Sequence, residues 1–212
     1  MAKKKVKEKE VVIKDNYNDY IIAIDSSMSD SGVSVYSLSR NEIVYVGHCN
    51  TGNVRALKKY RGYNINAVKL SIQRDFFEDL KRRFPPRLVI FEKSFAKFKK
   101  ETEAINQMNG VLYSVFWNYT QIKYAPTSVK AEIAHGKAEK EQVRDILLLN
   151  LPELEGNKLF YDNDNASDAV AVLMTHLLKT GIYKKVDWNK GELKIPLPKK
   201  RIAITKINNT IY

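Results

Sequence analysis

The sequence predicts an α/β fold in which a mixed five-stranded sheet is flanked by helices. Five short segments are apolar or alternate between apolar and polar residues, as strands do, and segments with helical steps of three and four follow the first three. The length and the 44% hydrophobic content suffice for one ordinary core. We therefore expect one central domain over residues 18–183, a basic flexible tail over 1–17 and a basic extension over 184–212.

Three strands are expected close together at the start of the domain. Residues 20–25 form an apolar run that ends in Asp25, and residues 32–38 and 42–47 form two further strand-like segments. Short polar connections join these segments, which is typical of antiparallel neighbours. We expect an antiparallel meander.

Helices and two more strands complete the predicted order. Apolar residues step by three and four over residues 65–80, as on an amphipathic helix, and Pro85 and Pro86 end the pattern. Residues 88–92 are continuously apolar up to Glu92, which fits a central strand buried on both faces. The segments expected after it are a helix over 101–118, a strand over 121–124, short and longer helices over 128–134 and 139–149, and a last helix over 166–178.

Composition favours a polyanionic partner. Lys and Arg total 36 against 24 Asp and Glu, so the formal net charge is +12, which fits nucleic acid better than an anionic membrane. No run reaches the roughly 18 apolar residues that span a bilayer, and the N-terminus lacks the apolar stretch of a secretory signal. We expect a cytoplasmic protein without membrane association. The single cysteine, Cys49, excludes an internal disulfide or a multi-cysteine zinc site.

Three carboxylates interrupt otherwise apolar segments. Asp25 and Glu92 end predicted strands, and Asp168 lies inside the last predicted helix. A buried carboxylate is costly and usually serves chemistry. A helix laid across the two strand ends would bring the three together, and converging oxygen ligands are what a pair of magnesium ions requires. In a basic chain, this pattern predicts metal ions that face the phosphates of a nucleic acid.

Five sequence blocks surround these acids: IIAIDSSMSDSGVSVY, LVIFEKSF, AINQMNGVLYSVF, YAPTSVKAEIAHGKAEKEQV and NASDAVAVLMTH. In order and spacing they resemble the blocks of RuvC-type Holliday junction resolvases, especially those of the phage branch, over about residues 19–180. The resemblance implies a ribonuclease-H-like fold, a homodimer, and hydrolysis of DNA phosphodiesters at four-way junctions. It also implies two Mg²⁺ ions, for which Mn²⁺ would substitute, with Asp25, Glu92 and Asp168 as ligands.

The fourth metal ligand departs from the family pattern. Bacterial relatives usually have an acid or a histidine three residues before the last Asp, whereas this chain has Asn165 there, preceded by Asp164. Either side chain could share a helix face with Asp168. We assign Asp164 to the catalytic set and keep Asn165 as an alternative ligand, because a carboxylate binds magnesium better than an amide. Asp164 could instead serve only to cap the helix.

The resemblance also indicates residues that contact DNA. Lys130 and Lys140 match two family lysines near the scissile phosphate, where an ammonium group can stabilise the transition state. Phe95 matches the family's aromatic residue that inserts or stacks at the crossover. The other expected contacts are Lys93, Lys97, Lys99, Lys100 and Lys137.

Two other functions stay open at this point. One is a nuclease of the same fold that acts on flapped or otherwise branched DNA or on RNA. The other is a noncatalytic junction-binding protein that has lost a metal ligand, which Asn165 makes conceivable. The extension has an alternating segment at 201–207 that predicts an added strand, either for DNA contact or for the dimer; a plain solvated tail is the alternative.

Overall fold

The computed structural model describes residues 19–56, 58–93, 99–185 and 188–190 of the chain. The first half contains the strands β1 (Tyr20–Asp25), β2 (Asp30–Ser37) and β3 (Glu42–Asn50), the short 3-10 helices η1 (Gly52–Ala56) and η2 (Lys58–Tyr60), helix α1 (Ile65–Arg83) and strand β4 (Pro86–Glu92). The second half contains helix α2 (Lys99–Val115), strand β5 (Thr120–Tyr124), helices α3 (Pro126–Ile133) and α4 (Lys140–Asn150), the 3-10 helix η3 (Pro152–Leu154), and helices α5 (Lys158–Asp162) and α6 (Asp164–Thr180).

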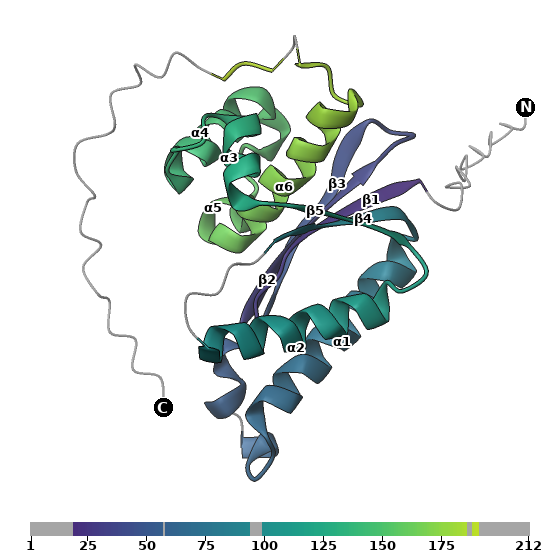
Figure 1. Ribbon diagram of the computed structural model, residues 1–212, viewed down its shortest axis with the longest axis vertical. Coiled ribbons are helices and arrows are strands. Elements are labelled where there is room, and N and C mark those ends of the chain that lie inside the picture. Colours follow the sequence, from purple (N-terminus) through teal and green to yellow (C-terminus); the bar gives the residue numbers. More distant parts are fainter. Residues whose placement is uncertain (1–18, 57, 94–98, 186–187, 191–212) are drawn as a thin grey trace, which may run out of the picture.

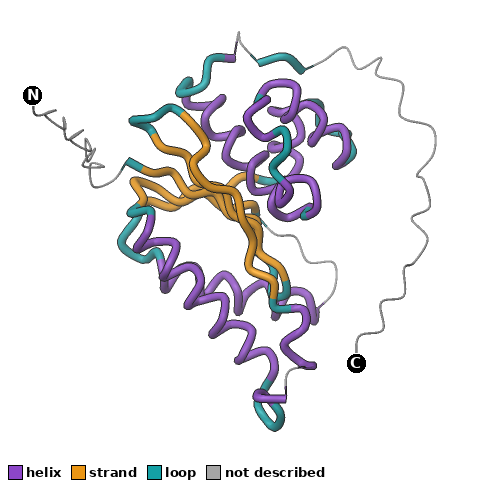
Figure 2. Tube along the Cα trace, turned by 180° about the vertical axis from the view of Figure 1, so that it is seen from behind, coloured by secondary structure: helices purple, strands orange, loops and turns teal. Residues whose placement is uncertain are grey.

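The strands form one five-stranded sheet in the order β3-β2-β1-β4-β5. β1 pairs antiparallel with β2, and β2 with β3, whereas β1 pairs parallel with β4 and β4 with β5. The predicted mixed five-stranded sheet and its antiparallel meander are confirmed. Helices cover both faces: α1 and α2 lie on one, and α3 to α6 lie on the other (Figure 1). The view from behind shows the same three layers (Figure 2).

The central strand β1 is buried on both faces, which explains its unbroken apolar sequence. Ile21 and Ala23 belong to the core on the side of α3 to α6, whereas Ile22 and Ile24 belong to the core on the side of α1 and α2. Because side chains alternate along a strand, the next residue after Ile24 returns to the α6 face. Asp25 is therefore directed towards the α6 layer.

α6 approaches the sheet closely at Gly32 of β2. A Cβ atom built on Gly32 would lie 1.8 Å from the backbone oxygen of Asn165 and 2.6 Å from the backbone nitrogen of Ala166. Only a residue without a side chain allows this contact. Gly32 is also the partner of Asp25 in the β1–β2 ladder, so the close contact lies beside the predicted site.

The second predicted helix ends earlier than expected. The pattern predicted 101–118, but α2 stops at Val115, where the side chain of Lys81 donates to the carbonyl oxygen of Val115 at 2.9 Å. Gln121 similarly donates to the carbonyl of Phe116 at 2.8 Å. These side chains satisfy carbonyls at the end of the helix.

Chain packing continues past the expected domain boundary at residue 183. Trp188 is 7% exposed and belongs to the core between the sheet and α3 to α6. The tail 1–17 and the strand predicted at 201–207 lie outside the described residues.

Within the described part of the chain, no helix combines the length and apolar character needed to cross a bilayer. Cys49 is a free, buried thiol on β3. Burial, together with the nearby charge of Asp30, raises the pKa of this thiol to about 11.

We expect Gly32→Ala to destabilise the protein by about 1–3 kcal/mol or more, because the added methyl group overlaps the α6 backbone. Gly110→Ala is the matched control: Gly110 lies within α2, and a Cβ there meets nothing within 4 Å. This control should stabilise by about 0.5–1 kcal/mol, as an exposed helical glycine-to-alanine change does. Urea unfolding of both variants measures the difference; equal stability of the two would contradict the packing argument.

Candidate active site

The ends of β1 and β4 place two carboxylates side by side. The strands run parallel, with Ile24 paired to Phe91, so that Asp25 and Glu92 follow at the same level of the sheet. Ile90 faces the α6 layer, and alternation turns Glu92 to that face as well. Asp168 comes to the same place from the second turn of α6.

These three acids share one cleft with both predicted lysines. The cleft holds about 210 Å³, several times the roughly 30 Å³ of one water molecule in the liquid. Polar side chains come from the two strand ends, α3, α4 and α6, and apolar ones from the same helices. The lining residues are Asp25, Glu92, Pro126, Val129, Lys130, Lys140, Val143, Asp168 and Ala171.

Crowding of negative charge dominates the electrostatics of the cleft. Burial, followed by the charges of Glu92 and Asp168, raises the pKa of Asp25 to about 8. Burial and the charge of Asp168 raise the pKa of Glu92 to about 7. Asp25 and Glu92 are also hydrogen-bonded to each other, so without added cations they share a proton. A cleft of this kind stabilises cations.

Lys140 supplies one such cation. Its Nζ atom lies 2.5 Å from Oδ2 of Asp168, and that carboxylate is 23% exposed. Burial acts to lower the pKa of Lys140, but the hydrogen bond and the attraction to Asp168 outweigh it, and the pKa lies above its ordinary value. Lys130, on α3, is half-buried and also lines the cleft.

The donor set fits a magnesium site by its chemistry. Three carboxylates converge from rigid elements, and Mg²⁺ prefers such oxygen ligands. The raised pKa values of Asp25 and Glu92 show that their ionised forms lack sufficient positive charge nearby. Among the described residues, no three His, Cys, Asp or Glu side chains already form a closed ligand group. Lys140 instead holds Asp168, so this carboxylate would exchange partners when metal binds.

The structure does not bring the two candidates for the fourth ligand into the lining of the cleft. Asp164 is the first residue of α6, and its side chain is 63% exposed and paired with Arg144 of α4 at 2.5 Å. Asn165 is half-buried, and its backbone oxygen lies at the contact with Gly32. The charge of Asp164 nevertheless contributes to the raised pKa of Lys140.

Sequence reasoning missed the anchor of the α6 N-terminus. Asn163 caps the helix by accepting from the backbone nitrogen of Ala166 at 2.8 Å. Its amide nitrogen donates to Oδ2 of Asp30 at 2.8 Å, and the other carboxylate oxygen of Asp30 lies 2.8 Å from Nδ1 of His48. β2 and β3 thereby hold the start of the helix that carries Asp168. An Asn before a helix is a visible capping signal, but its strand partners are not visible in sequence.

A second anchor holds the loop that follows Asp25. Gln73 is fully buried on α1, and its amide nitrogen donates to the carbonyl oxygens of Ser27 and Cys49, each at 3.2 Å. Lys69, one turn earlier, donates to the hydroxyl of Ser29 at 2.8 Å. A polar residue on the buried face of an amphipathic helix was the only sequence signal for this role.

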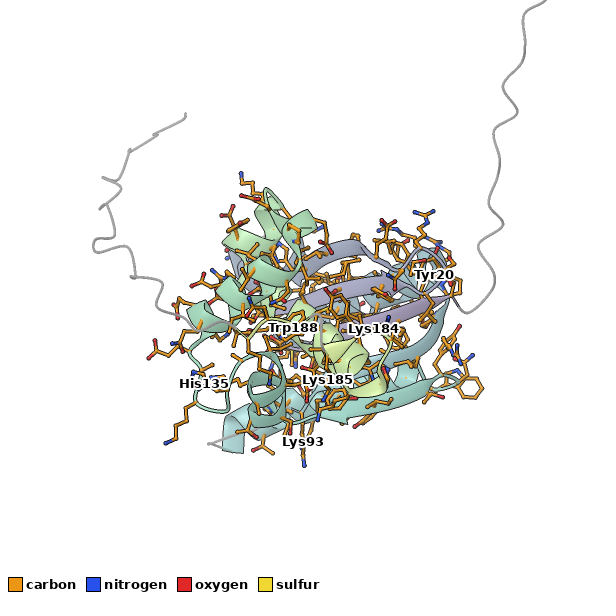
Figure 3. All side chains as sticks on the ribbon, turned by 90° about the horizontal axis from the view of Figure 1, so that it is seen from above. Tyr20, Lys93, His135, Lys184, Lys185 and Trp188 are labelled. Atoms are coloured by element: carbon orange, nitrogen blue, oxygen red, sulfur yellow. The ribbon has the colours of Figure 1, made fainter. Side chains whose placement is uncertain are left out.

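Two of the other predicted contacts are exposed lysines, and the rest lie wholly or partly outside the described residues. Lys93 follows Glu92 and is exposed, as is Lys137 in the turn between α3 and α4. In Figure 3, Lys93 lies at one edge of the molecule, and His135 marks the connection between α3 and α4. Lys99 and Lys100 begin α2, but the structure does not describe their side chains. Phe95 and Lys97 lie outside the described residues.

A family comparison agrees with this geometry. The model of the family described as crossover junction endodeoxyribonuclease RuvC matches residues 21–176, which include all five polar residues of the cleft. The chain belongs to the RuvC family. It is therefore a junction-resolving endonuclease, a hydrolase that cleaves DNA, and RuvC-like resolvases are metal-dependent nucleases. Among curated protein sequences, no significant match was found.

Solved structures share the fold of this RuvC-family chain. RuvC from Thermus thermophilus, in complex with a Holliday junction substrate, matches with a TM-score of 0.59 and 16% identity, covering 77% of this chain and 96% of its own. The yeast mitochondrial Holliday junction resolvase Ydc2 matches with a TM-score of 0.54 and 13% identity, covering 81% and 85%. The predicted ribonuclease-H-like fold is confirmed.

In metal-free buffer we expect Asp25→Asn to be more stable than the wild type, by a margin that grows with pH. A carboxyl group whose folded pKa is about 8, against about 4 in the unfolded chain, stabilises the fold while protonated. That contribution is lost as the pH rises towards 8, whereas asparagine is unaffected. Thermal unfolding with EDTA at pH 5 and pH 9 should show a relative gain of at least about 1 kcal/mol at the higher pH.

The control for this experiment is Asp75→Asn, which changes an exposed carboxylate on α1. Its stability relative to the wild type should differ little between the two pH values. Added Mg²⁺ should stabilise the wild type and the control, but not Asp25→Asn. A margin for Asp25→Asn that is the same at pH 5 and pH 9 would contradict the electrostatic account.

Proposed function

We propose that this RuvC-family protein resolves four-way DNA junctions by paired symmetric nicks, as a homodimer that uses magnesium ions. One observation carries the proposal: Asp25, Glu92 and Asp168 meet in a single cleft with Lys130 and Lys140. Acidic ligands for metal and basic groups for phosphate are the two components that hydrolysis of a phosphodiester needs. The products would be 5′-phosphate and 3′-hydroxyl ends that a ligase can join.

The carboxylates are the proposed metal holders. Asp25, Glu92 and Asp168 would each present oxygen atoms from the end of a strand or from a helix packed against it. Two bound magnesium ions would supply activation of a water nucleophile and stabilisation of the leaving 3′-oxygen. Asp164 remains our proposed fourth ligand, with Asn165 as the alternative; Mn²⁺ should substitute for Mg²⁺.

The lysines are the proposed phosphate contacts. Lys140 is 51% exposed although it is paired with Asp168, so its flexible side chain has room to turn to a phosphate oxygen. Lys130 faces the same cleft from α3. Each ammonium group would stabilise the negative charge that develops on the phosphorus oxygens in the transition state.

Other groups are proposed to bind the junction. Phe95 lies three residues after Glu92 and would stack on bases at the crossover, where one base is worth about 1–3 kcal/mol. Further basic residues would contact the DNA backbone. These are Lys93, Lys97, Lys99, Lys100 and Lys137. A homodimer follows from the proposed symmetry of the cuts, because two cuts at related positions need two active sites.

Asp25→Asn should abolish cleavage of an immobile four-way junction and leave junction binding within about threefold, because the fold and the basic residues remain. The wild type should make paired nicks at symmetric positions with Mg²⁺, none with EDTA, and none in a matched linear duplex. End-labelled strands map the nicks, and gel shift in Ca²⁺ measures binding.

Different results would favour the other functions. Efficient cutting of flaps with no paired nicks in junctions would indicate a broader branched-DNA nuclease. Tight junction binding without cleavage in Mg²⁺ or Mn²⁺ would indicate a noncatalytic binding protein.

Asp164→Asn tests the fourth ligand. If Asp164 holds metal, this variant should need about tenfold more Mg²⁺ for half-maximal cleavage, since a charged ligand has been lost. Asp162→Asn is the matched control, because Asp162 is an exposed carboxylate at the end of α5. A normal Mg²⁺ dependence for Asp164→Asn, with a raised requirement for Asn165→Ala, would transfer the role to Asn165.

A further inference from the structure

Helix α3, which lines the cleft through Pro126, Val129 and Lys130, ends in carbonyl groups that its own backbone does not satisfy. The last carbonyls of a helix have no intrahelical donors, and an eight-residue helix has few turns to stabilise it. The backbone nitrogen of Ala134 closes onto the carbonyl of Lys130 at 2.9 Å. The carbonyls of Ala131 and Ile133 need other partners.

Residues beyond α6 supply these partners. Trp188 donates from Nε1 to the carbonyl oxygen of Ile133 at 3.0 Å, and Lys190 donates from Nζ to the carbonyl oxygen of Ala131 at 2.8 Å. Lys185 pairs with the carboxylate of Glu132 at 2.7 Å. Three consecutive residues of α3 are thus held by three side chains of one segment, which we name the capping segment: Lys185, Trp188, Asn189 and Lys190.

The capping segment is anchored by packing as well as by polar bonds. Trp188 is 7% exposed and meets Tyr183 edge to face, with ring centroids 5.8 Å apart. Asn189 exchanges two hydrogen bonds with Asn150, the last residue of α4, at 2.7 and 2.8 Å. In Figure 3, Lys184, Lys185 and Trp188 lie close together over the helical layer that includes α6. The segment therefore joins the C-terminal ends of α3 and α4.

Both helices carry a lysine into the cleft. Lys130 immediately precedes the three held residues of α3, and Lys140 is the first residue of α4. A cation at a helix C-terminus is also favourable for the helix dipole, which adds to the effect of Lys190. A shift of about 1 Å in a group that contacts the reacting phosphate can reduce the rate by about 100-fold.

We propose that Trp188 and Lys190 are positioning residues, which fix α3 so that Lys130 is held at the scissile phosphate. The proposal rests on the proposed function of Lys130. It assigns a role to part of the extension: the capping segment completes the active site.

The test is the double variant Trp188→Phe with Lys190→Met, which retains an aromatic ring and an aliphatic chain but removes both donors. In single-turnover cleavage at saturating Mg²⁺, we expect a rate about tenfold lower, with the dissociation constant for the junction within about twofold of the wild type. Amide hydrogen exchange over residues 126–134 should become faster. Two single variants refine the test. Lys190→Met should cleave more slowly than the wild type, whereas Lys190→Arg, which keeps a donor and a charge, should retain most of the wild-type rate.

Lys184→Met is the matched control: it removes the same charge from an exposed position of this stretch and should leave both rate and exchange unchanged. Combining the double variant with a substitution of Lys130 then distinguishes a positioning role from a general loss of folding or stability. In a Lys130→Gln background, the double variant should cost no further rate; a full additional tenfold loss there would overturn the proposal, as would a normal rate in the double variant.

Failure of the proposed function has a different signature. If the wild type does not cleave junctions at all, the role of Lys130 fails, and hydrogen exchange alone decides whether the capping segment holds α3. Unchanged exchange in the double variant would overturn that anchoring directly.

Discussion

The close contact between α6 and Gly32 is the constraint on which the site depends. A helix rests against a sheet at a distance that its side chains set, and here the absence of a side chain lets the α6 backbone come into contact with β2. Asp168 lies one turn further along the helix and so is brought down to the level of the strand ends. The cap formed by Asn163, with Asp30 and His48 behind it, fixes where the helix starts.

The electrostatic character of the cleft follows from that packing. Three acids come together where apolar residues limit their hydration, which explains both the raised pKa of Asp25 and the proton that it shares with Glu92. Lys140 partly neutralises the group through Asp168, and Lys130 adds a second positive charge at the lining. The fold thus makes room for cations at one end of its central strands, at a cost in the stability of the metal-free protein.

The sequence was informative wherever a local pattern was sufficient. Alternation and apolar runs identified all five strands, and acids that interrupt such runs identified Asp25, Glu92 and Asp168. The short elements in 52–60 and 152–162 were missed, because one or two helical turns do not establish a period. Partners distant in sequence were equally invisible: the pair of Arg144 with Asp164, the bond from Trp188 to Ile133, and the hold of Gln73 on the loop after Asp25 each require the tertiary structure.

The isolated thiol of Cys49 has a practical consequence for spectroscopy. Thiol-directed dyes react with the thiolate, and a group with a pKa of about 11 is ionised only to about one part in ten thousand at neutral pH. Burial on β3 further blocks access. The native chain should therefore react little with such dyes, and a cysteine introduced at an exposed position can be labelled selectively with a fluorophore. Distance changes between a labelled protein and a labelled junction arm can then be followed without first replacing a native residue.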